Sequence, residues 1–194
     1  MSFWDILYSR DQPVIGMSPM DGVTDAPFRY MVSKYGRPDV IFTEFVSVDG
    51  LHFAERVKRE RMLKEFIKAR DLIVSERSES RKSGLPFEVA QVFGNKPEFF
   101  VESAELIESL GFDGVDINMG CPAKNVSENG CGAALIKMPK LAQEIILATK
   151  AATKLPVSLK TRIGVSSASE MDEWMAAICE VRPANISLHG RTLK

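Results

Sequence analysis

Short apolar segments alternate with amphipathic helical patterns along most of the chain, and this alternation limits the fold more than any other feature. The expected strands cover residues 14–17, 40–45, 87–93, 113–117, 156–160 and 185–189. The expected helices cover residues 28–35, 51–69, 97–110, 139–153 and 169–181, and residues 71–84 fit a loop or a small hairpin. Strands and helices that alternate through short connections predict a parallel sheet with right-handed crossovers.

Residues that begin and end helices support these boundaries. Thr24 or Asp25 is expected to cap the helix over 28–35, with Pro27 near its first turn and Gly36 at its end. Gly111 directly follows the helix over 97–110, where a left-handed cap is favoured.

Polar residues lie at or just past the carboxyl ends of the six expected strands: Ser18, Glu44, Gln91, Asn118, Lys160 and His189. A barrel brings all strand ends to one rim, whereas an open Rossmann sheet mainly uses those beside one switch point. A Rossmann sheet would also have GxGxxG after its first strand, where this chain has SPMDGVTD. We therefore expect a TIM (β/α)8-type barrel, with about six of the eight βα units in residues 1–194.

Charge and composition exclude several classes of protein. The formal net charge is -1, so no overall field favours nucleic acid or a membrane surface. Residues 55–82 are locally basic, which fits either a solvated helix face or a contact with phosphates. Three cysteines, without a signal peptide or a long apolar run, predict a cytoplasmic protein with no membrane span. Histidines and cysteines lack the paired spacing of a zinc site, so we expect no metal.

The three cysteines have different surroundings in the sequence. Cys121 lies in a Gly-Cys-Pro turn after an apolar strand, where a thiol can donate a proton or act as a nucleophile. A small buried apolar residue is an equally good interpretation of Cys121. Cys131 stands between two glycines, which favours a tight turn over a chemical role, and Cys179 is expected in the core with Met175 and Ile178.

The other strand-end residues each have a functional and a structural interpretation. Lys160 suits the electron-rich ring or phosphate of a cofactor, or else extends its ammonium into solvent. His189 either donates to a ligand carbonyl or ring nitrogen or is a hydrogen-bonded structural residue. Gln91 either contacts a planar heterocycle or satisfies backbone groups, and Glu44 either orients a neighbour or contacts a substrate.

Five segments carry a resemblance to a known family. They are MSPMDGVTDAPFR (17–29), EVAQVFG (88–94), GVDINMGCPAKNV…GCGAALI (114–136), PVSLKTRIG (156–164) and SLHGRT (187–192). In order and spacing they resemble the tRNA dihydrouridine synthase family over nearly the whole chain. The resemblance implies an FMN-dependent TIM barrel that reduces the C5–C6 double bond of particular uridines in tRNA, with NADPH regenerating the reduced flavin.

The resemblance also implies roles for individual residues. Cys121 matches the cysteine that protonates uracil C5, while Asn118 and Arg191 match positions that contact the substrate. The expected FMN contacts are Ser18, Pro19, Met20, Gln91, Lys160 and His189.

The family pattern extends beyond Lys194, with two more strands, glycine-rich loops for the FMN phosphate and a helical domain that binds tRNA. We therefore expect residues 1–194 to be a partial catalytic barrel. Two alternatives are another FMN barrel acting on a free pyrimidine, like a dihydroorotate dehydrogenase, and a non-catalytic RNA-binding fragment. The LHGRT strand and the TDAPFR segment disfavour the first alternative.

Overall fold

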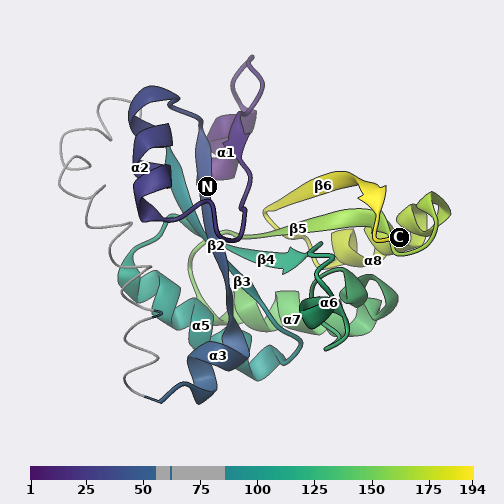
Figure 1. Ribbon diagram of the computed structural model, residues 1–194. Helices are drawn as coiled ribbons and strands as arrows, with labels where there is room; N and C mark the ends of the chain where they lie inside the picture. The colour runs from purple at the N-terminus through teal and green to yellow at the C-terminus, as the bar shows by residue number, and fades with distance from the viewer. Residues whose placement is uncertain (56–61, 63–85) are drawn as a thin grey trace.

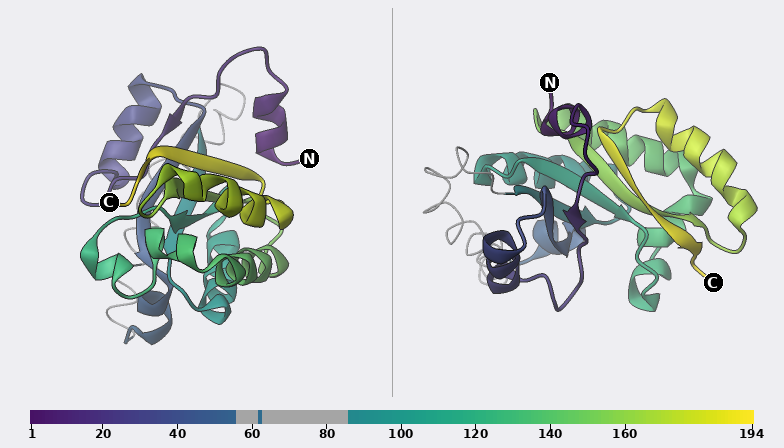
Figure 2. Two further views of the ribbon diagram at one scale, coloured as in Figure 1. Left: turned by 90° about the vertical axis from the view of Figure 1, so that its right-hand side faces the viewer. Right: turned by 90° about the horizontal axis from the view of Figure 1, so that it is seen from above.

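The computed structural model describes residues 1–55, 62 and 86–194, and the strands of these residues form a single sheet (Figure 1). All six are parallel, and each pairs with its neighbours in the sequence. The strands are β1 (Gly16–Met17), β2 (Val40–Ser47), β3 (Phe87–Phe93), β4 (Gly114–Met119), β5 (Val157–Gly164) and β6 (Asn185–Thr192). The expected partial TIM barrel is confirmed, because the parallel sheet curves into a half-barrel (Figure 2).

Helices connect the strands and cover mainly one side of the sheet. The α-helices are α1 (Phe3–Tyr8), α2 (Ala26–Tyr35), α3 (Val48–Phe53), α5 (Pro97–Leu110), α6 (Lys124–Ser127), α7 (Pro139–Ala152) and α8 (Met171–Glu180), and the 3-10 helices are η1 (Gly132–Lys137) and η2 (Ala168–Glu170). Helices α5, α7 and α8 pack on the outer face, whereas α1 packs on the opposite, inner face (Figures 1 and 2). Among the described residues, no helix is long and apolar enough to cross a membrane.

The main hydrophobic core lies between the outer face of the sheet and these three helices. Val115, Ile117 and Met119 alternate along β4 and are fully buried there, with Phe100 from α5 and Ile145 from α7. Burial of a large apolar side chain contributes roughly 1.5–3 kcal/mol to the free energy of unfolding. Because side chains alternate along a strand, the residues between these three project from the inner face.

Two predicted helix ends are confirmed by their caps. The side chain of Asp25 accepts a hydrogen bond from the N–H of Phe28 at 2.9 Å, so Asp25 rather than Thr24 caps α2. Helix α5 covers the predicted residues 97–110, and Gly111 ends it with φ 74° in the left-handed region.

Within its described part, the predicted helix over 51–69 is confirmed only at residues 51–53 and 62. Helix α3 already begins at Val48, because Ser47 Oγ accepts from the N–H of Gly50 at 3.0 Å, and it ends at Phe53. Ala54 is extended, with ψ 127°, so the helix does not continue through it. The rest of that prediction, the loop over 71–84 and nearly all of the basic segment 55–82 lie outside the described residues.

Strands β2, β4, β5 and β6 run further than the sequence indicated. Pairing between β5 and β6 continues past Lys160, where Arg162 lies opposite His189. The predicted placement of four residues is therefore corrected, because they lie within their strands rather than at or past the carboxyl ends: Glu44, Asn118, Lys160 and His189.

Helix α1 was missed by the sequence interpretation, although its signal is present. Ser2 and Asp5 form a capping box, in which each side chain bonds the backbone N–H of the other. The helix buries Phe3, Trp4 and Leu7 against the first residues of β2 and β3. It therefore closes the inner face at the amino-terminal ends of the strands, and the carboxyl-terminal half carries polar residues instead.

Candidate functional site

The inner face carries a band of polar side chains where β3, β4 and β5 pair. Gln91 lies opposite Asp116 in the register, and Asp116 lies opposite Ser158. Two residues further along, Asn118 lies opposite Lys160. The alternation of side chains brings all five to the inner face, where the first four are buried and Lys160 is half-buried.

Hydrogen bonds join four of these side chains into one continuous series. Ser158 Oγ donates to Asp116 Oδ1 at 2.6 Å, and Gln91 Nε2 donates to Asp116 Oδ2 at 2.7 Å. Asn118 Nδ2 donates in turn to Gln91 Oε1 at 3.0 Å. Burial raises the pKa of Asp116 to about 6, although the bonds from Ser158 and Gln91 and the charge of Lys160 oppose this shift. Both oxygens of the carboxylate act as acceptors in this arrangement.

The two residues Gly120 and Cys121, which we call the Cys121 turn, follow β4 directly. Asn118 Oδ1 accepts hydrogen bonds from the N–H groups of Gly120 (3.1 Å) and Cys121 (2.9 Å). Arg162 Nε donates to the Gly120 carbonyl at 2.7 Å, and the N–H of Ala133 donates to the Cys121 carbonyl at 3.1 Å. All four backbone polar groups of the turn thus have partners, which fixes the position from which the thiol projects.

The structure separates the three cysteines clearly. Cys121 is half-buried, and its thiol forms no hydrogen bond with any described residue. Cys131 is buried, and burial, together with a nearby carboxylate, raises the pKa of its thiol to about 11. The expectation that Cys179 belongs to the core is wrong, because it is exposed on α8, which buries Trp174 and Ile178 instead. Cys121 is therefore the cysteine best placed for chemistry.

Basic side chains gather beside the Cys121 turn on β5 and β6. Burial lowers the pKa of Lys160, although the charge of Asp116 partly offsets this effect. Burial and the charges of Arg162, Lys160 and Arg191 lower the pKa of His189. Within the described part of the chain, the side chains of Lys160 and His189 form no hydrogen bond or ion pair, and Arg191 is exposed. A half-buried ammonium that forms no hydrogen bond with any described residue fits an anionic or electron-rich ligand such as a flavin ring.

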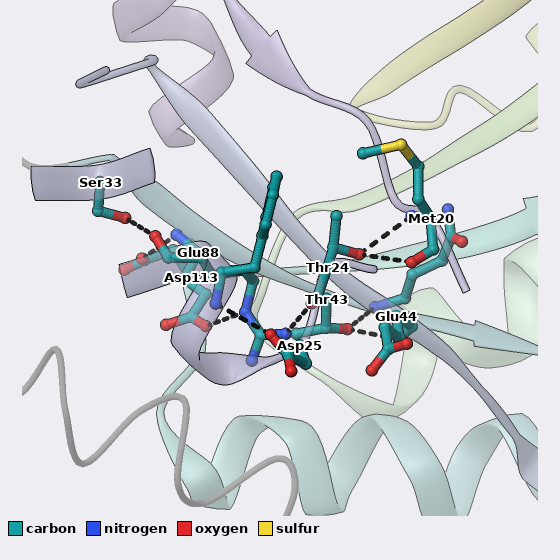
Figure 3. A network of polar contacts seen from close by, with 11 residues as sticks. Met20, Thr24, Asp25, Ser33, Thr43, Glu44, Glu88 and Asp113 are labelled. Atoms are coloured by element: carbon teal, nitrogen blue, oxygen red, sulfur yellow. Dashed lines mark hydrogen bonds and ion pairs between the residues drawn. The ribbon is translucent and has the colours of Figure 1, made fainter. Parts of the chain in front are cut away.

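A polar network holds the loop after β1 against β2 (Figure 3). Thr24 Oγ1 accepts from the N–H of Met20 at 3.0 Å and donates to the Met20 carbonyl at 3.1 Å. The Glu44 carboxylate accepts from the N–H of Gly22. This contact agrees with the interpretation of Glu44 as a residue that orients its neighbours.

The network continues into a buried ion pair between α2 and β3 (Figure 3). Arg29 Nε lies 3.1 Å from Glu88 Oε1, and both side chains are almost completely buried. Arg29 also donates to the carbonyl of Thr24, so the ion pair supports the loop that contains the predicted cofactor contacts.

Three of the predicted cofactor contacts, Ser18, Pro19 and Met20, lie apart from the other predicted site residues. Ser18 and Met20 are exposed and Pro19 is half-buried, in the loop after β1 at one edge of the sheet. His189 lies on β6 at the other edge. Among the described residues, no hydrogen bond or ion pair joins residues 18–20 to Lys160 or His189.

Sequence reasoning missed three side chains that hold the site together. Asp116 and Ser158 form the buried end of the hydrogen-bonded series, and Arg162 holds the Gly120 carbonyl. The signal for Asp116 was present, because a carboxylate inside the apolar segment GVDIN is costly to bury without partners.

A cavity of about 910 Å³ lies at the opposite ends of the strands, between α1 and the segments that precede β2 to β6. Its lining includes the basic residues Arg37, Lys154 and Arg182 but none of the predicted site residues. The described residues contain no cluster of His, Cys, Asp and Glu that could hold a metal ion. The chemistry indicated by the sequence therefore belongs to the Cys121 end of the inner face.

Parallel strands that carry reactive side chains on the inner face of a half-barrel define a β/α-barrel enzyme of the TIM type. Residues 16–194 match the family model described as "Dihydrouridine synthase (Dus)". The chain therefore belongs to the dihydrouridine synthase family, and these matches do not favour a dihydroorotate dehydrogenase-like barrel or a non-catalytic RNA-binding protein.

Curated relatives support the same family. The chain is 40% identical over 193 residues to a "Probable tRNA-dihydrouridine synthase" of Staphylococcus aureus (strain COL), covering 100% of this chain and 53% of the relative. It is 39% identical over 191 residues to "Probable tRNA-dihydrouridine synthase 2" of Bacillus subtilis (strain 168), covering 98% and 53%. The chain thus spans about half the length of the curated relatives that it matches.

Solved structures resemble the fold at low sequence identity. A structure titled as a variant of NCR from Zymomonas mobilis has a TM-score of 0.60 and 14% identity, covering 91% of this chain and 64% of that one. The carboxyl transferase domain of Rhizobium etli pyruvate carboxylase has a TM-score of 0.52 and 17% identity, covering 88% and 24%. These likenesses concern the fold alone.

Proposed function

We propose that this chain carries the ring-side half of a flavin-dependent tRNA-dihydrouridine synthase site. The reaction is reduction of the C5–C6 double bond of uridine in tRNA, with FMN as cofactor, NADPH as reductant and a cytoplasmic location. Family membership supports the reaction type. The observation that carries the proposal is the Cys121 turn, whose backbone is fully hydrogen-bonded and which follows β4 directly, beside the strand that carries Lys160.

Cys121 is the proton donor at uracil C5 in this proposal. When hydride reaches C6, negative charge develops towards C5 and the C4 carbonyl, so an acid is required on the face of the base opposite the hydride source. Bound reduced flavin supplies hydride chemistry. The Cys121 thiol has no hydrogen bond to a described residue, and its backbone is already fixed, so it needs no rearrangement to present its proton.

Asn118 and Arg191 serve the substrate in this proposal. Three hydrogen bonds already use Asn118: its oxygen accepts twice and one of its N–H groups donates to Gln91. Its second N–H therefore remains for a base carbonyl. Arg191 is exposed at the end of β6, where a guanidinium can contact tRNA phosphate. The target base has to leave its stack to reach the inner face.

Lys160 and His189 are the proposed partners of the flavin ring. Both lack a hydrogen bond within the described residues, and a cation at this place offsets negative charge on a reduced ring. Gln91 is fully buried and donates one N–H to Asp116. Its proposed contact with the cofactor therefore uses the second N–H or the free lone pair of its amide. Ser18, Pro19 and Met20 complete the proposed contacts from the loop after β1.

The proposed reaction is tested with FMN, NADPH and tRNA that lacks dihydrouridine, in a protein of the relatives' full length that contains these residues. We expect dihydrouridine with the unaltered protein, and its loss in Cys121→Ala with tRNA binding retained. Cys179→Ala is the matched control, because that cysteine is exposed on α8 and far along the chain from the turn. Equal activity of the two variants, or none in the unaltered full-length protein, contradicts the proposal.

Flavin binding is tested separately by titrating the chain with FMN and following the visible absorption of the flavin. Lys160→Met is expected to weaken binding by about tenfold to a hundredfold, since a charge-assisted contact contributes roughly 1.5–3 kcal/mol. Lys154→Met removes an exposed lysine at the opposite end of the sheet and is expected to bind like the unaltered chain. Equal weakening in both variants contradicts the assignment of Lys160.

A further inference from the structure

The buried series of hydrogen bonds has a defined direction. Each side-chain amide has a donor end and an acceptor end, so the group at one end of the series determines how every amide in it is oriented. Asp116 accepts from the nitrogen of Gln91, so the oxygen of Gln91 faces Asn118. That oxygen accepts from the nitrogen of Asn118, so the oxygen of Asn118 faces the N–H groups of the Cys121 turn.

Reversal of this direction would place like groups against each other. If the group at position 116 donated to Gln91, the Gln91 oxygen would turn towards it and the Gln91 nitrogen towards Asn118. The Asn118 nitrogen would then face the N–H groups of Gly120 and Cys121, and these two partly buried donors would lose their acceptor. An unpaired donor costs up to about 1–3 kcal/mol when it is buried, and two partly buried donors would lose their acceptor together, so the turn would move.

We propose that Asp116 is a positioning residue for Cys121, which acts through the amides of Gln91 and Asn118 by supplying the acceptor that sets their orientation. Ser158 holds the other carboxylate oxygen and so fixes the carboxylate itself. The importance of this role for catalysis rests on the proposed function, whereas the role itself concerns only the conformation of the Cys121 turn.

An acceptor, rather than a negative charge, is what the series requires at position 116. In Asp116→Asn the new amide can direct its oxygen to Gln91 and its nitrogen to Ser158 Oγ, while that hydroxyl donates to the Val115 carbonyl, 3.4 Å away. The direction of the series is then kept. Asp116→Ala removes the acceptor of the Gln91 nitrogen, so only the N–H groups of the Cys121 turn still orient the two amides.

The test uses the chain labelled with ¹⁵N only at cysteine, which gives one backbone amide signal for each of the three cysteines. Asp116→Ala is expected to shift the Cys121 signal, and Asp116→Asn to leave it near its original position. Cys131 and Cys179 report on the rest of the fold in the same spectrum. Neither flavin nor tRNA is present, so failure of this test is distinguishable from failure of the proposed reaction.

Val115→Ala is the matched control, because Val115 neighbours Asp116 but is buried on the outer face. It makes a cavity without touching the hydrogen-bonded series and is expected to leave the Cys121 signal in place. If Asp116→Ala does not fold, Gln91→Met takes its place, since it interrupts the series with a side chain of similar length.

A double variant then separates positioning from general loosening of the structure. Once Asn118→Ala has removed the last member of the series, adding Asp116→Ala is expected to shift the Cys121 signal no further. An unchanged Cys121 signal in Asp116→Ala overturns the proposal, as does an equal shift in Asp116→Asn or Val115→Ala. Additive shifts in the double variant overturn it as well.

Discussion

Gly132 lies so close to Cys121 that a Cβ atom at position 132 would be 2.9 Å from the Cys121 carbonyl oxygen. Gly132 also has φ +58°, in the left-handed region that side chains disfavour. The next residue, Ala133, donates its N–H to that same carbonyl. The segment over residues 130–133 therefore packs against the Cys121 turn and bonds its carbonyl, whereas Asn118 bonds its N–H groups.

Gly132→Ala should lower the free energy of unfolding by about 1–3 kcal/mol, because it combines a strained φ with a contact that the backbone cannot relieve. Urea unfolding measures this loss. Gly190→Ala is the matched control, since a Cβ atom there meets nothing within 4 Å. Equal stability of the two variants would show that the turn tolerates a side chain at position 132.

Asp116 should make stability depend on pH in a defined direction. Its folded pKa of about 6 lies above the ordinary 3.8, so the bound proton stabilises the folded state fully below about pH 3.8. This contribution is lost as the pH rises through about 6. The shift of about two pKa units corresponds to about 3 kcal/mol.

Asp116→Asn lacks this titration, so its free energy of unfolding relative to the unaltered chain should rise by up to about 3 kcal/mol between pH 4 and pH 7. Urea unfolding at several pH values for both proteins measures the difference. A difference that stays constant over this range would mean that Asp116 titrates normally.

His189 should respond to removal of the neighbouring ammonium. Its pKa is lowered first by burial and then by the charges of Arg162, Lys160 and Arg191. Lys160→Met removes one of these charges, so the pKa of His189 should rise. NMR titration can follow it directly, because the chain contains only two histidines. Lys150→Met, which changes a lysine bound to carbonyls of residues 181 and 182, should leave the titration of His189 unchanged.

The buried ion pair between Arg29 and Glu88 should be costly to break from one side. Arg29→Met leaves the Glu88 carboxylate buried without this partner and should cost about 3–5 kcal/mol of the free energy of unfolding. Arg10→Met breaks the more exposed ion pair with Asp39 and should cost less than about 1 kcal/mol. Thermal and urea unfolding of both variants test this order, and similar losses would contradict it.

The parallel sheet and most of its helices could be predicted because their signals are local. The helix over 97–110 has Pro97 at its start and Gly111 at its end, and the structure keeps both boundaries. The strand over 87–93 is also unchanged, because turn-forming Gly94 and Asn95 follow it. Fold and family were therefore accessible from the sequence.

The site was only partly predictable because its contacts depend on register and burial. The sequence marked Asn118 and Cys121 but could not show that the Asn118 amide is used mainly to hold the Cys121 turn. Cys179 was misplaced because a helical pattern alone did not show which side of α8 packs on the sheet. The roles of Ser18, Gln91, Lys160 and His189 in binding the cofactor stay predictions, as do the substrate contacts of Asn118 and Arg191.

The order of the strands in the sheet has a consequence for how the chain folds. Each strand after β1 pairs with the strand directly before it in the sequence. No pair in this sheet therefore requires two strands that are separated by another strand in the sequence. Parallel pairing is slow when it requires closure of long loops, but here each closure spans one connection between neighbouring strands. During synthesis the edge that receives each strand already exists when that strand emerges, so the sheet can grow one βα unit at a time from β1 towards β6.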